Sequence, residues 1–126
     1  MGRTIGEVAE QHGVPTHVLR HWEHAGALRP RRTESGHRRY DAEHDVQIEL
    51  IQCGKVAGLS LDQITVMLHG LPTERAPLLR RRLVELERSA MEVEASKRLL
   101  GHVLSCEAPT SCPECAHPQG SFDFPD

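Results

Sequence analysis

A chain of 126 residues has room for one compact domain with an appendage, and a net charge of −3 argues against a protein that coats nucleic acid along its length. It has no apolar run of about 18 residues and no N-terminal signal-peptide pattern, so we expect a cytoplasmic protein without a membrane span. Its charge is uneven. Residues 1–40 carry seven Arg against four Glu, whereas residues 105–126 carry four acidic residues and no Lys or Arg. Such a distribution suits a protein that holds DNA at one end only.

The first forty residues begin with two predicted short helices joined by a tight turn. Thr4 can cap the first helix, and Gly13 can end it. The second helix is expected from Thr16 to about Ala25. Gly26 then suits the left-handed backbone conformation that closes a helix.

The second helix should have one apolar and one polar face. Leu19 and Trp22 lie three residues apart, so both side chains should point into the domain. The opposite face is polar and consists of Thr16, His17, Arg20, His21 and His24. In a helix-turn-helix, this is the face that the recognition helix presents to the major groove of DNA.

An arginine-rich hairpin is predicted directly after the second helix. Ser35 and Gly36 form a dipeptide that favours a chain reversal. The arginines that flank it are Arg29, Arg31, Arg32, Arg38 and Arg39. A basic hairpin beside a recognition helix is typical of a wing that contacts phosphates. The segment up to Tyr40 therefore predicts a winged helix-turn-helix.

Two further short helices are predicted after the wing. Asp41 can cap the third helix, and we expect its packing face to carry Val46, Leu50, Ile51 and Ala57. Cys53 lies among these positions and is expected to be a small core residue. Ser60 and Gln63 then form a capping-box pattern for the fourth helix.

One long helix is predicted over residues 73–104. Its apolar stripe alternates spacings of four and three and consists of Leu79, Leu83, Leu86, Ala90, Val93, Lys97, Leu100 and Leu104. This is the repeat of a coiled coil, and a narrow stripe on so long a helix needs a second helix to cover it. A second copy of the chain is the simplest partner, which predicts a homodimer. The alternative is a helix that folds back along its own domain.

The last segment, residues 105–126, is predicted to be a loop with an acidic tail. It contains four groups that bind soft metals, Cys106, Cys112, Cys115 and His117, and the two cysteines of CPEC can reach one tetrahedral ion. We expect zinc or another thiophilic ion, acting either as a sensed signal or as a fixed structural ion. A reversible disulfide and unused thiols are the alternatives. An enzyme with a cysteine nucleophile is not expected, because the chain has no Gly-rich phosphate loop and little room for a substrate pocket.

Three motifs, IGEVAEQHGV, LRHWEHAGAL and RRTESGHRRY, resemble in order and spacing the DNA-binding pattern of the MerR family of transcriptional regulators. His21 and Trp22 stand where tyrosines are usual, and GLSLDQI matches as well. The resemblance covers residues 1–71 and implies a winged helix-turn-helix head within an all-α fold with a small β wing. The polar face of the second helix and the resemblance together indicate the residues that contact DNA. These are Thr16, His17, Arg20, His21, Arg32, Arg38, Arg39 and Tyr40.

The resemblance also implies how such a regulator works. Members of the family dimerise through an antiparallel pair of long helices, bind inverted-repeat promoter elements and alter how RNA polymerase engages the promoter. Metal-sensing members commonly complete their site with a Cys or Ser near the start of the partner's long helix, but GLPTER, residues 70–75, has no cysteine. Iron–sulfur members use four cysteines in the last loop, where this chain has three and His117, so a cluster fits less well. We therefore expect a regulator that responds at its Cys/His loop to a metal ion or to thiol oxidation. The alternative is a loop that is structural or unused, with an unrelated effector.

Overall fold

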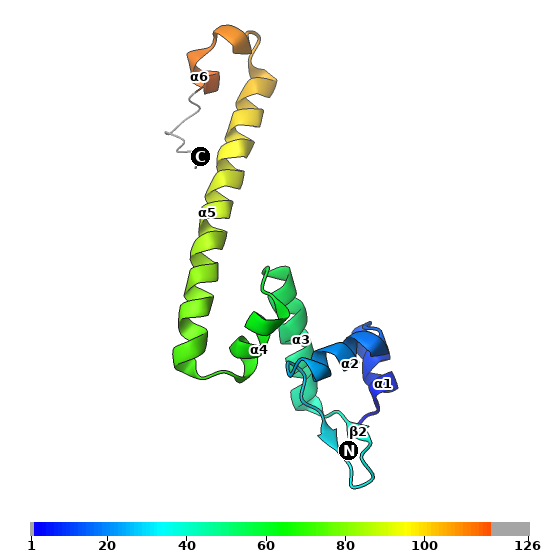
Figure 1. The fold of residues 1–126 in the computed structure, drawn as a ribbon. Helices are drawn as coiled ribbons and strands as arrows, with labels where there is room; N and C mark the ends of the chain where they lie inside the picture. The colour runs from blue at the N-terminus through cyan, green and yellow to red at the C-terminus, as the bar shows by residue number, and fades with distance from the viewer. Residues whose placement is uncertain (1, 117–126) are drawn as a thin grey trace. The chain divides into compact units, whose positions relative to one another are not determined.

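The computed structural model describes residues 2–116, which are almost entirely helical (Figure 1). The elements in chain order are α1 Ile5–His12, α2 Thr16–His24, β1 Arg31–Arg32, β2 Arg38–Arg39, α3 Ala42–Val56, α4 Leu61–His69, α5 Pro72–Ser105, the 3-10 helix η1 Pro109–Ser111 and α6 Pro113–Ala116. This confirms the predicted fold class. The chain forms two compact units, Met1–Leu79, called here the head, and Arg80–Asp126. No helix in the described part of the chain is both long and apolar enough to cross a membrane.

Local capping fixes the ends of the head helices where the sequence predicts them. The Thr4 hydroxyl accepts a hydrogen bond of 3.3 Å from the Glu7 backbone N–H, and the Glu7 carboxylate accepts one from Thr4 in return. Gly13 closes α1 with a φ of 64°, in the left-handed region where glycine is preferred. Ser60 and Gln63 form the predicted capping box of α4.

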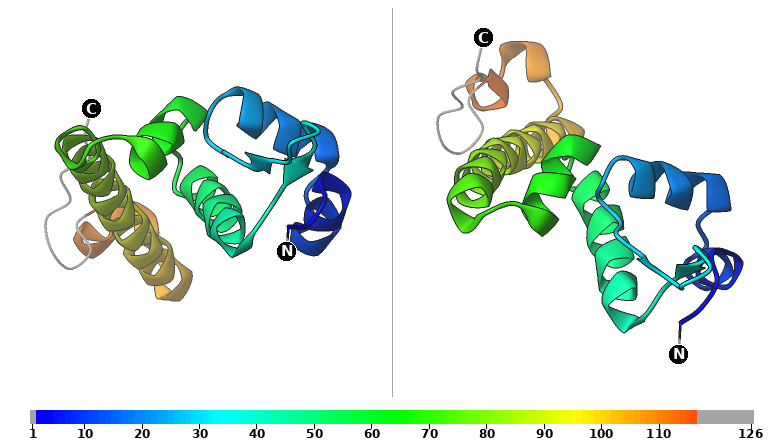
Figure 2. Two further views of the ribbon diagram at one scale, coloured as in Figure 1. Left: turned by 90° about the horizontal axis from the view of Figure 1, so that it is seen from below. Right: turned by 60° about the horizontal axis from the view of Figure 1, so that its bottom comes forward.

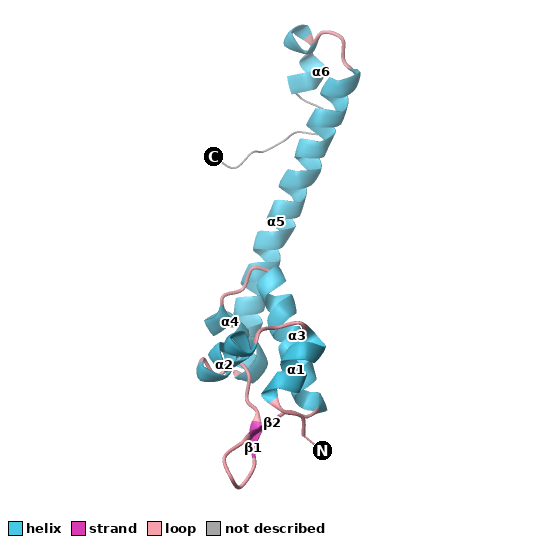
Figure 3. Cartoon of the chain, turned by 90° about the vertical axis from the view of Figure 1, so that its right-hand side faces the viewer, coloured by secondary structure: helices cyan, strands magenta, loops and turns pink. Residues whose placement is uncertain are grey.

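The wing is a two-stranded antiparallel hairpin, drawn in magenta in Figure 3. Arg31 pairs with Arg39, and Arg32 pairs with Arg38. The turn between the strands uses Gly36, whose φ is 83°. The wing is therefore short, and its paired strand positions are all arginines.

The core of the head lies among α1, α2, α3 and α4, which Figure 2 shows from two sides. Its fully buried large side chains are Val8, Leu19, Leu28, Tyr40, His44, Ile48, Ile51 and Ile64. Trp22 is also buried, with 3% of its surface exposed. Leu78 and Leu79 pack against this cluster, so the first turns of α5 belong to the head.

The prediction for the packing face of α3 is wrong in part. Val46 and Leu50 are 54% and 41% exposed, and Cys53 is exposed rather than a core residue. The buried face instead contains His44, Ile48 and Ile51, with Gly54 at its end. A Cβ at Gly54 would lie 2.8 Å from the Ile64 side chain, so α4 packs directly on the α3 backbone. That close approach fixes which face of α3 is buried.

The second unit is dominated by α5. From Leu83 onward, its Leu and Val side chains on the predicted coiled-coil stripe are exposed in the single chain, from 38% for Leu86 to 89% for Leu104. The segment after α5 is more ordered than the predicted loop, because Pro109 begins η1 and Pro113 begins α6. Proline suits the first turn of a helix, where its fixed φ is favourable and its missing N–H costs nothing.

Candidate DNA interface and candidate metal centre

The second helix, α2, has the two faces that the sequence predicts. Leu19 and Trp22 are buried on one side. The opposite side presents four exposed side chains, His17, Arg20, His21 and His24. Thr16 begins the helix and is half-buried. Because an α-helix fits the major groove, this basic and polar face is the candidate surface for reading DNA.

Glu23 holds the wing against α2. One of its carboxylate oxygens accepts from Arg32 Nη2 at 2.5 Å, and the other accepts from Arg38 Nε. The Glu23 side chain is only 13% exposed, so these ion pairs are shielded from water on one side. The sequence-based predictions did not include Glu23. An acidic residue on the helix before an arginine hairpin could nevertheless have indicated an ion pair between the two. The effect of Glu23 is to set the position of the wing relative to α2.

The remaining arginines of the interface differ in whether they are already paired. Arg31 forms an ion pair with Glu43 at 3.0 Å and a longer one with Asp41. In the described part of the chain, neither Arg20 nor Arg39 lies within ion-pair distance of a carboxylate. Among the described residues, Arg20 and Arg39 are thus not held in an ion pair, which favours contact with phosphates.

Tyr40 lies inside the head rather than on the DNA-facing surface. Its side chain is fully buried and packs edge-on against the His44 ring, with ring centroids 5.8 Å apart. Burial, with a smaller contribution from the Glu23 charge, raises the pKa of Tyr40 to about 12. The structure thus shows a packing role for Tyr40, and its predicted contact with DNA stays a prediction.

His44 lies beside Asp41 and Glu43, in a group whose side chains could in principle bind a metal ion. Its Nδ1 accepts from the Asp41 backbone N–H at 2.7 Å, and its Nε2 lies 2.9 Å from the Arg29 carbonyl oxygen. These two bonds require a neutral ring with the proton on Nε2. Both ring nitrogens are therefore engaged, and His44 joins the wing to α3 rather than offering a ligand.

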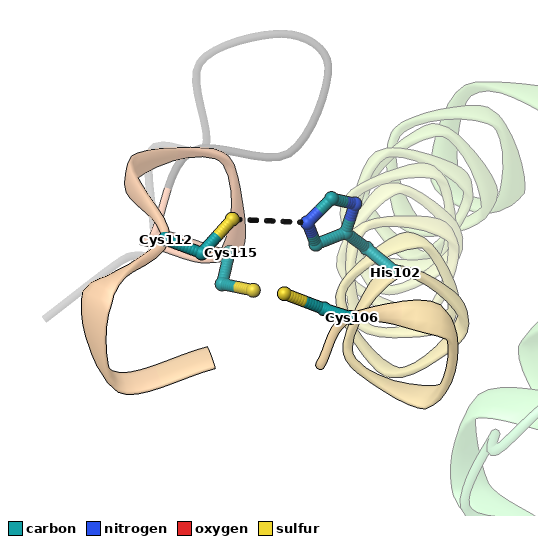
Figure 4. Close-up of side chains that lie close together, drawn as sticks. All are labelled: His102, Cys106, Cys112 and Cys115. Carbon is teal, nitrogen blue, oxygen red and sulfur yellow. Dashed lines mark hydrogen bonds between the residues drawn. The ribbon is translucent and has the colours of Figure 1, made fainter. Parts of the chain in front are cut away.

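Four potential metal ligands meet at the end of α5: His102, Cys106, Cys112 and Cys115 (Figure 4). Their ligand atoms all lie within 4.8 Å of one another. His102 lies in the last turns of α5, and Cys106 is the first residue after the helix, so both lie at its end. Cys112 and Cys115 come from the chain that returns through η1 and α6, and Figure 4 shows their sulfurs directed toward the α5 pair.

The structure brings the three predicted cysteines together and adds a histidine that the predictions missed. His117, the predicted fourth ligand, lies outside the described residues. His102 takes that place, with Nε2 at 3.6 Å from the Cys112 sulfur. Its signal in the sequence is the spacing of four from Cys106 at the end of the long helix, which the spacing of CPEC alone does not indicate.

The neighbours of each thiol favour different protonation states. The hydrogen bond from His102, followed by the backbone N–H of Cys115, lowers the pKa of Cys112 to about 6. Burial, followed by hydrogen bonding with the other two cysteines, raises the pKa of Cys115 to about 12. These surroundings therefore favour the thiolate at Cys112 and the protonated thiol at Cys115.

The donor set fits a tetrahedral thiophilic ion. Zinc binds cysteine sulfur at about 2.3 Å and histidine nitrogen at about 2.0–2.1 Å, which puts tetrahedral sulfurs roughly 3.8 Å apart. The observed limit of 4.8 Å between ligand atoms means that shifts of about 1 Å or less would complete such a site. Three sulfurs and one imidazole are the ligands of structural zinc sites, and all four belong to one chain.

Comparisons with known proteins show which family this chain resembles and which proteins are similar to it. The family of MerR HTH regulatory proteins matches residues 3–71. Nodulation protein NolA of Bradyrhizobium diazoefficiens is 37% identical over 112 residues, which cover 87% of this chain and 47% of NolA. The HTH-type transcriptional regulator HmrR of Rhizobium leguminosarum bv. viciae is 25% identical over 117 residues, covering 88% of this chain and 91% of HmrR.

Solved structures share the fold. The crystal structure of HiNmlR, a MerR family regulator lacking the sensor domain and bound to promoter DNA, matches with a TM-score of 0.66 and 26% identity. The match covers 83% of this chain and 89% of HiNmlR. The chain spans less than half the length of the NolA proteins that it matches.

Proposed function

Because this chain belongs to the MerR family and is a DNA-binding transcriptional regulator rather than an enzyme, we propose that it binds an inverted-repeat promoter element as a homodimer. We further propose that it changes transcription in response to a thiophilic metal ion bound near its C-terminus. The observation that carries the metal part is the set of four ligands, His102, Cys106, Cys112 and Cys115, on one chain. The remaining parts rest on the head and on the exposed stripe of α5.

The proposed DNA contacts combine α2 with the wing. His17, Arg20 and His21 enter the major groove, and Arg32, Arg38 and Arg39 bind phosphates beside it. The ion pairs of Glu23 support this division, because they hold Arg32 and Arg38 next to the recognition helix before DNA is bound. The promoter DNA bound by HiNmlR supports the same use of the head.

The exposed stripe on α5 supports dimerisation. Its side chains would lose solvent contact against the same stripe of a second copy, and burial of each leucine contributes about 1.5–3 kcal/mol. Two heads related by a two-fold axis would then meet two half-sites, which predicts an inverted repeat. The dimer would regulate transcription by changing how RNA polymerase engages that promoter.

The metal centre would join two segments of the chain. His102 in α5 and Cys106 directly after it would hold the ion from one side, and Cys112 and Cys115 would hold it from the returning segment. A bound zinc-like ion supplies four-coordinate bonding that no side-chain hydrogen bond can replace. Since His102 belongs to α5 and Cys106 directly follows it, order in the returning segment would be coupled to the end of α5.

Thiol oxidation is a second candidate, favoured by the lowered pKa of Cys112. In the presence of a peroxide, the Cys112 thiolate would attack one oxygen and, with one proton, give a sulfenic acid and water. The thiol of Cys106 or Cys115 would then displace a second water molecule and leave a disulfide. The short distances among the three sulfurs are compatible with that reaction.

Transcription in vitro distinguishes these functions. The template is a promoter that the protein itself selects from genomic DNA, and the protein is used reduced without metal, with zinc, or after peroxide treatment. The proposal predicts a change in transcript level with zinc in the wild type and none in Cys112→Ser. A change in transcript level with peroxide but not with zinc would mean that the signal is thiol oxidation and not metal binding. Zinc uptake without any effect on transcription would leave a structural site with an unrelated effector.

A further inference from the structure

The exposed face of α2 is unusually rich in histidine. His17, His21 and His24 are spaced four and three residues apart, so they form one stripe along the helix, with Arg20 beside it. All four side chains are exposed, and they lie opposite the buried Leu19 and Trp22. Histidine is the side chain that ordinarily gains a proton between about pH 5 and 8. Arginine keeps its charge throughout that range.

Within residues 2–116, no carboxylate pairs with the stripe. The only acidic residue on α2 is Glu23, and both its oxygens are engaged by the wing arginines. In the described part of the chain, none of the three histidines has an ion pair or hydrogen bond to another residue. The charged or titratable groups on the neighbouring elements are Glu7, Glu10 and His12 on α1, Arg31, Arg32, Arg38 and Arg39 in the wing strands, and Glu43, His44, Asp45, Glu49, Cys53 and Lys55 on α3.

Most of these neighbouring groups already have partners. Glu7 caps α1 with Thr4, His12 pairs with Asp45 at 2.7 Å, and the Lys55 ammonium lies over the Trp22 ring at 5.8 Å. The protein thus leaves the histidine stripe facing solvent without a counter-charge. A DNA backbone placed against this stripe would supply that counter-charge, because the duplex carries one negative charge per roughly 1.7 Å of its axis.

We propose that this stripe makes DNA binding proton-linked: His17, His21 and His24 take up protons from solvent as the helix docks, and the imidazolium ions bind phosphate oxygens and acceptor atoms at the base edges. This inference rests on the proposed placement of α2 against DNA. An imidazolium has two N–H donors, whereas a neutral ring has one. Each added charge also releases one more counterion from DNA, so affinity and its dependence on salt both increase as pH falls.

The test measures the affinity for promoter DNA from about pH 8 to about pH 6, the range in which histidine titrates, at constant ionic strength. The wild type should bind at least about tenfold more tightly at the lower pH. The triple variant His17→Gln, His21→Gln, His24→Gln should change by less than about threefold over the same range. The slope of log K against pH is compared, so a lower absolute affinity of the variant does not affect the conclusion. Both proteins share the C-terminal cluster, and any response that it makes to pH cancels in the difference.

The variant Arg20→Ala tests whether α2 contacts DNA independently of the histidine inference. Its charge does not titrate in this range, so that variant should bind more weakly but keep the pH slope of the wild type. A triple variant that retained the full slope, or a wild type without one, would overturn the histidine inference while leaving α2 on the DNA. If both Arg20→Ala and the triple variant bound DNA as tightly as the wild type, α2 would not contact DNA. In that case the proposed placement of α2 and the histidine inference would both be wrong. Calorimetry in two buffers of different ionisation enthalpy gives a second readout, the uptake of about one proton or more on binding by the wild type alone.

Discussion

The head and the unit that begins at Arg80 differ in how far their apolar side chains are buried. In the head, Leu19, Ile48, Ile51 and Ile64 are completely buried within one chain. Along α5, the side chains of the stripe remain exposed, and Leu104 is 89% exposed. A residue buried in a single chain contributes to folding, whereas an exposed stripe contributes only when something covers it. In the head, these side chains are buried within one chain, whereas the α5 stripe would be buried only against a partner, as in the proposed dimer.

The largest expected effect comes from placing a charge in the α5 stripe. Leu86→Asp would put two carboxylates, one from each copy, into the dimer seam, at a cost of several kcal/mol. Analytical ultracentrifugation should therefore find a monomer. Val84→Asp is the matched control, because Val84 is 64% exposed and lies off the stripe. A dimeric Leu86→Asp protein would show that the seam is placed wrongly, and a monomeric Val84→Asp protein would show that the whole helix surface matters.

A smaller effect is expected for a core truncation in the head. Ile51→Ala should lower the free energy of unfolding by about 2–5 kcal/mol, because it leaves a cavity among fully buried neighbours. On the same helix, Val46→Ala should cost less than about 0.5 kcal/mol. Denaturant unfolding of the full-length chain at one protein concentration measures both. Equal losses would mean that the outer face of α3 is covered in the dimer.

Loss of a wing arginine should weaken DNA binding without affecting folding. Arg38→Ala removes one candidate phosphate contact and leaves the Glu23 carboxylate with Arg32 alone. We expect about tenfold lower affinity and a salt slope reduced by about 0.9. Arg88→Ala, an exposed arginine of α5, serves as the control. If affinity and slope were the same in both variants, the wing would not contact phosphates.

The smallest effect concerns a polar contact at the base of the head. Asp45 accepts from Arg3 at 2.6 Å and pairs with His12, and the bond from Arg3 is the main reason that the pKa of Asp45 is lowered. Asp45→Asn should cost about 1 kcal/mol at neutral pH, since the site is partly exposed. A lowered carboxyl pKa stabilises the fold above the unfolded value near 4, and that stability is lost as pH falls through the folded pKa. The difference between wild type and variant should accordingly vanish in acid.

The two units also differ in how far their structure could be predicted. In the head, short-range signals sufficed: Thr4, Gly13 and Ser60 act within a few residues of themselves, and the structure has their helices where the sequence predicts them. The face of α3 could not be predicted in this way, because two apolar stripes compete along that helix. The choice depends on Ile64 packing on Gly54, a contact between different helices.

The metal centre shows the same limit at longer range. CPEC and Cys106 indicate a site from local spacing alone, and the structure brings these cysteines together. His102 precedes the motif on a helix that the sequence identifies as a coiled coil, so its role depends on the chain returning through η1 and α6. Propensity gives no indication of that return.

The central claim is that the C-terminal centre is a complete metal site within one chain, separate from the DNA-binding head. Titration of the reduced, full-length protein with cobalt(II) tests it most directly. One ion per chain should bind with thiolate-to-cobalt absorption and the strong visible bands of a tetrahedral site. Cys112→Ser should abolish tight uptake, His102→Gln should change the visible bands, and His117→Gln should leave the spectrum as in the wild type. Absence of thiolate-to-cobalt absorption, or a spectrum that depends on His117 and not on His102, would contradict the claim.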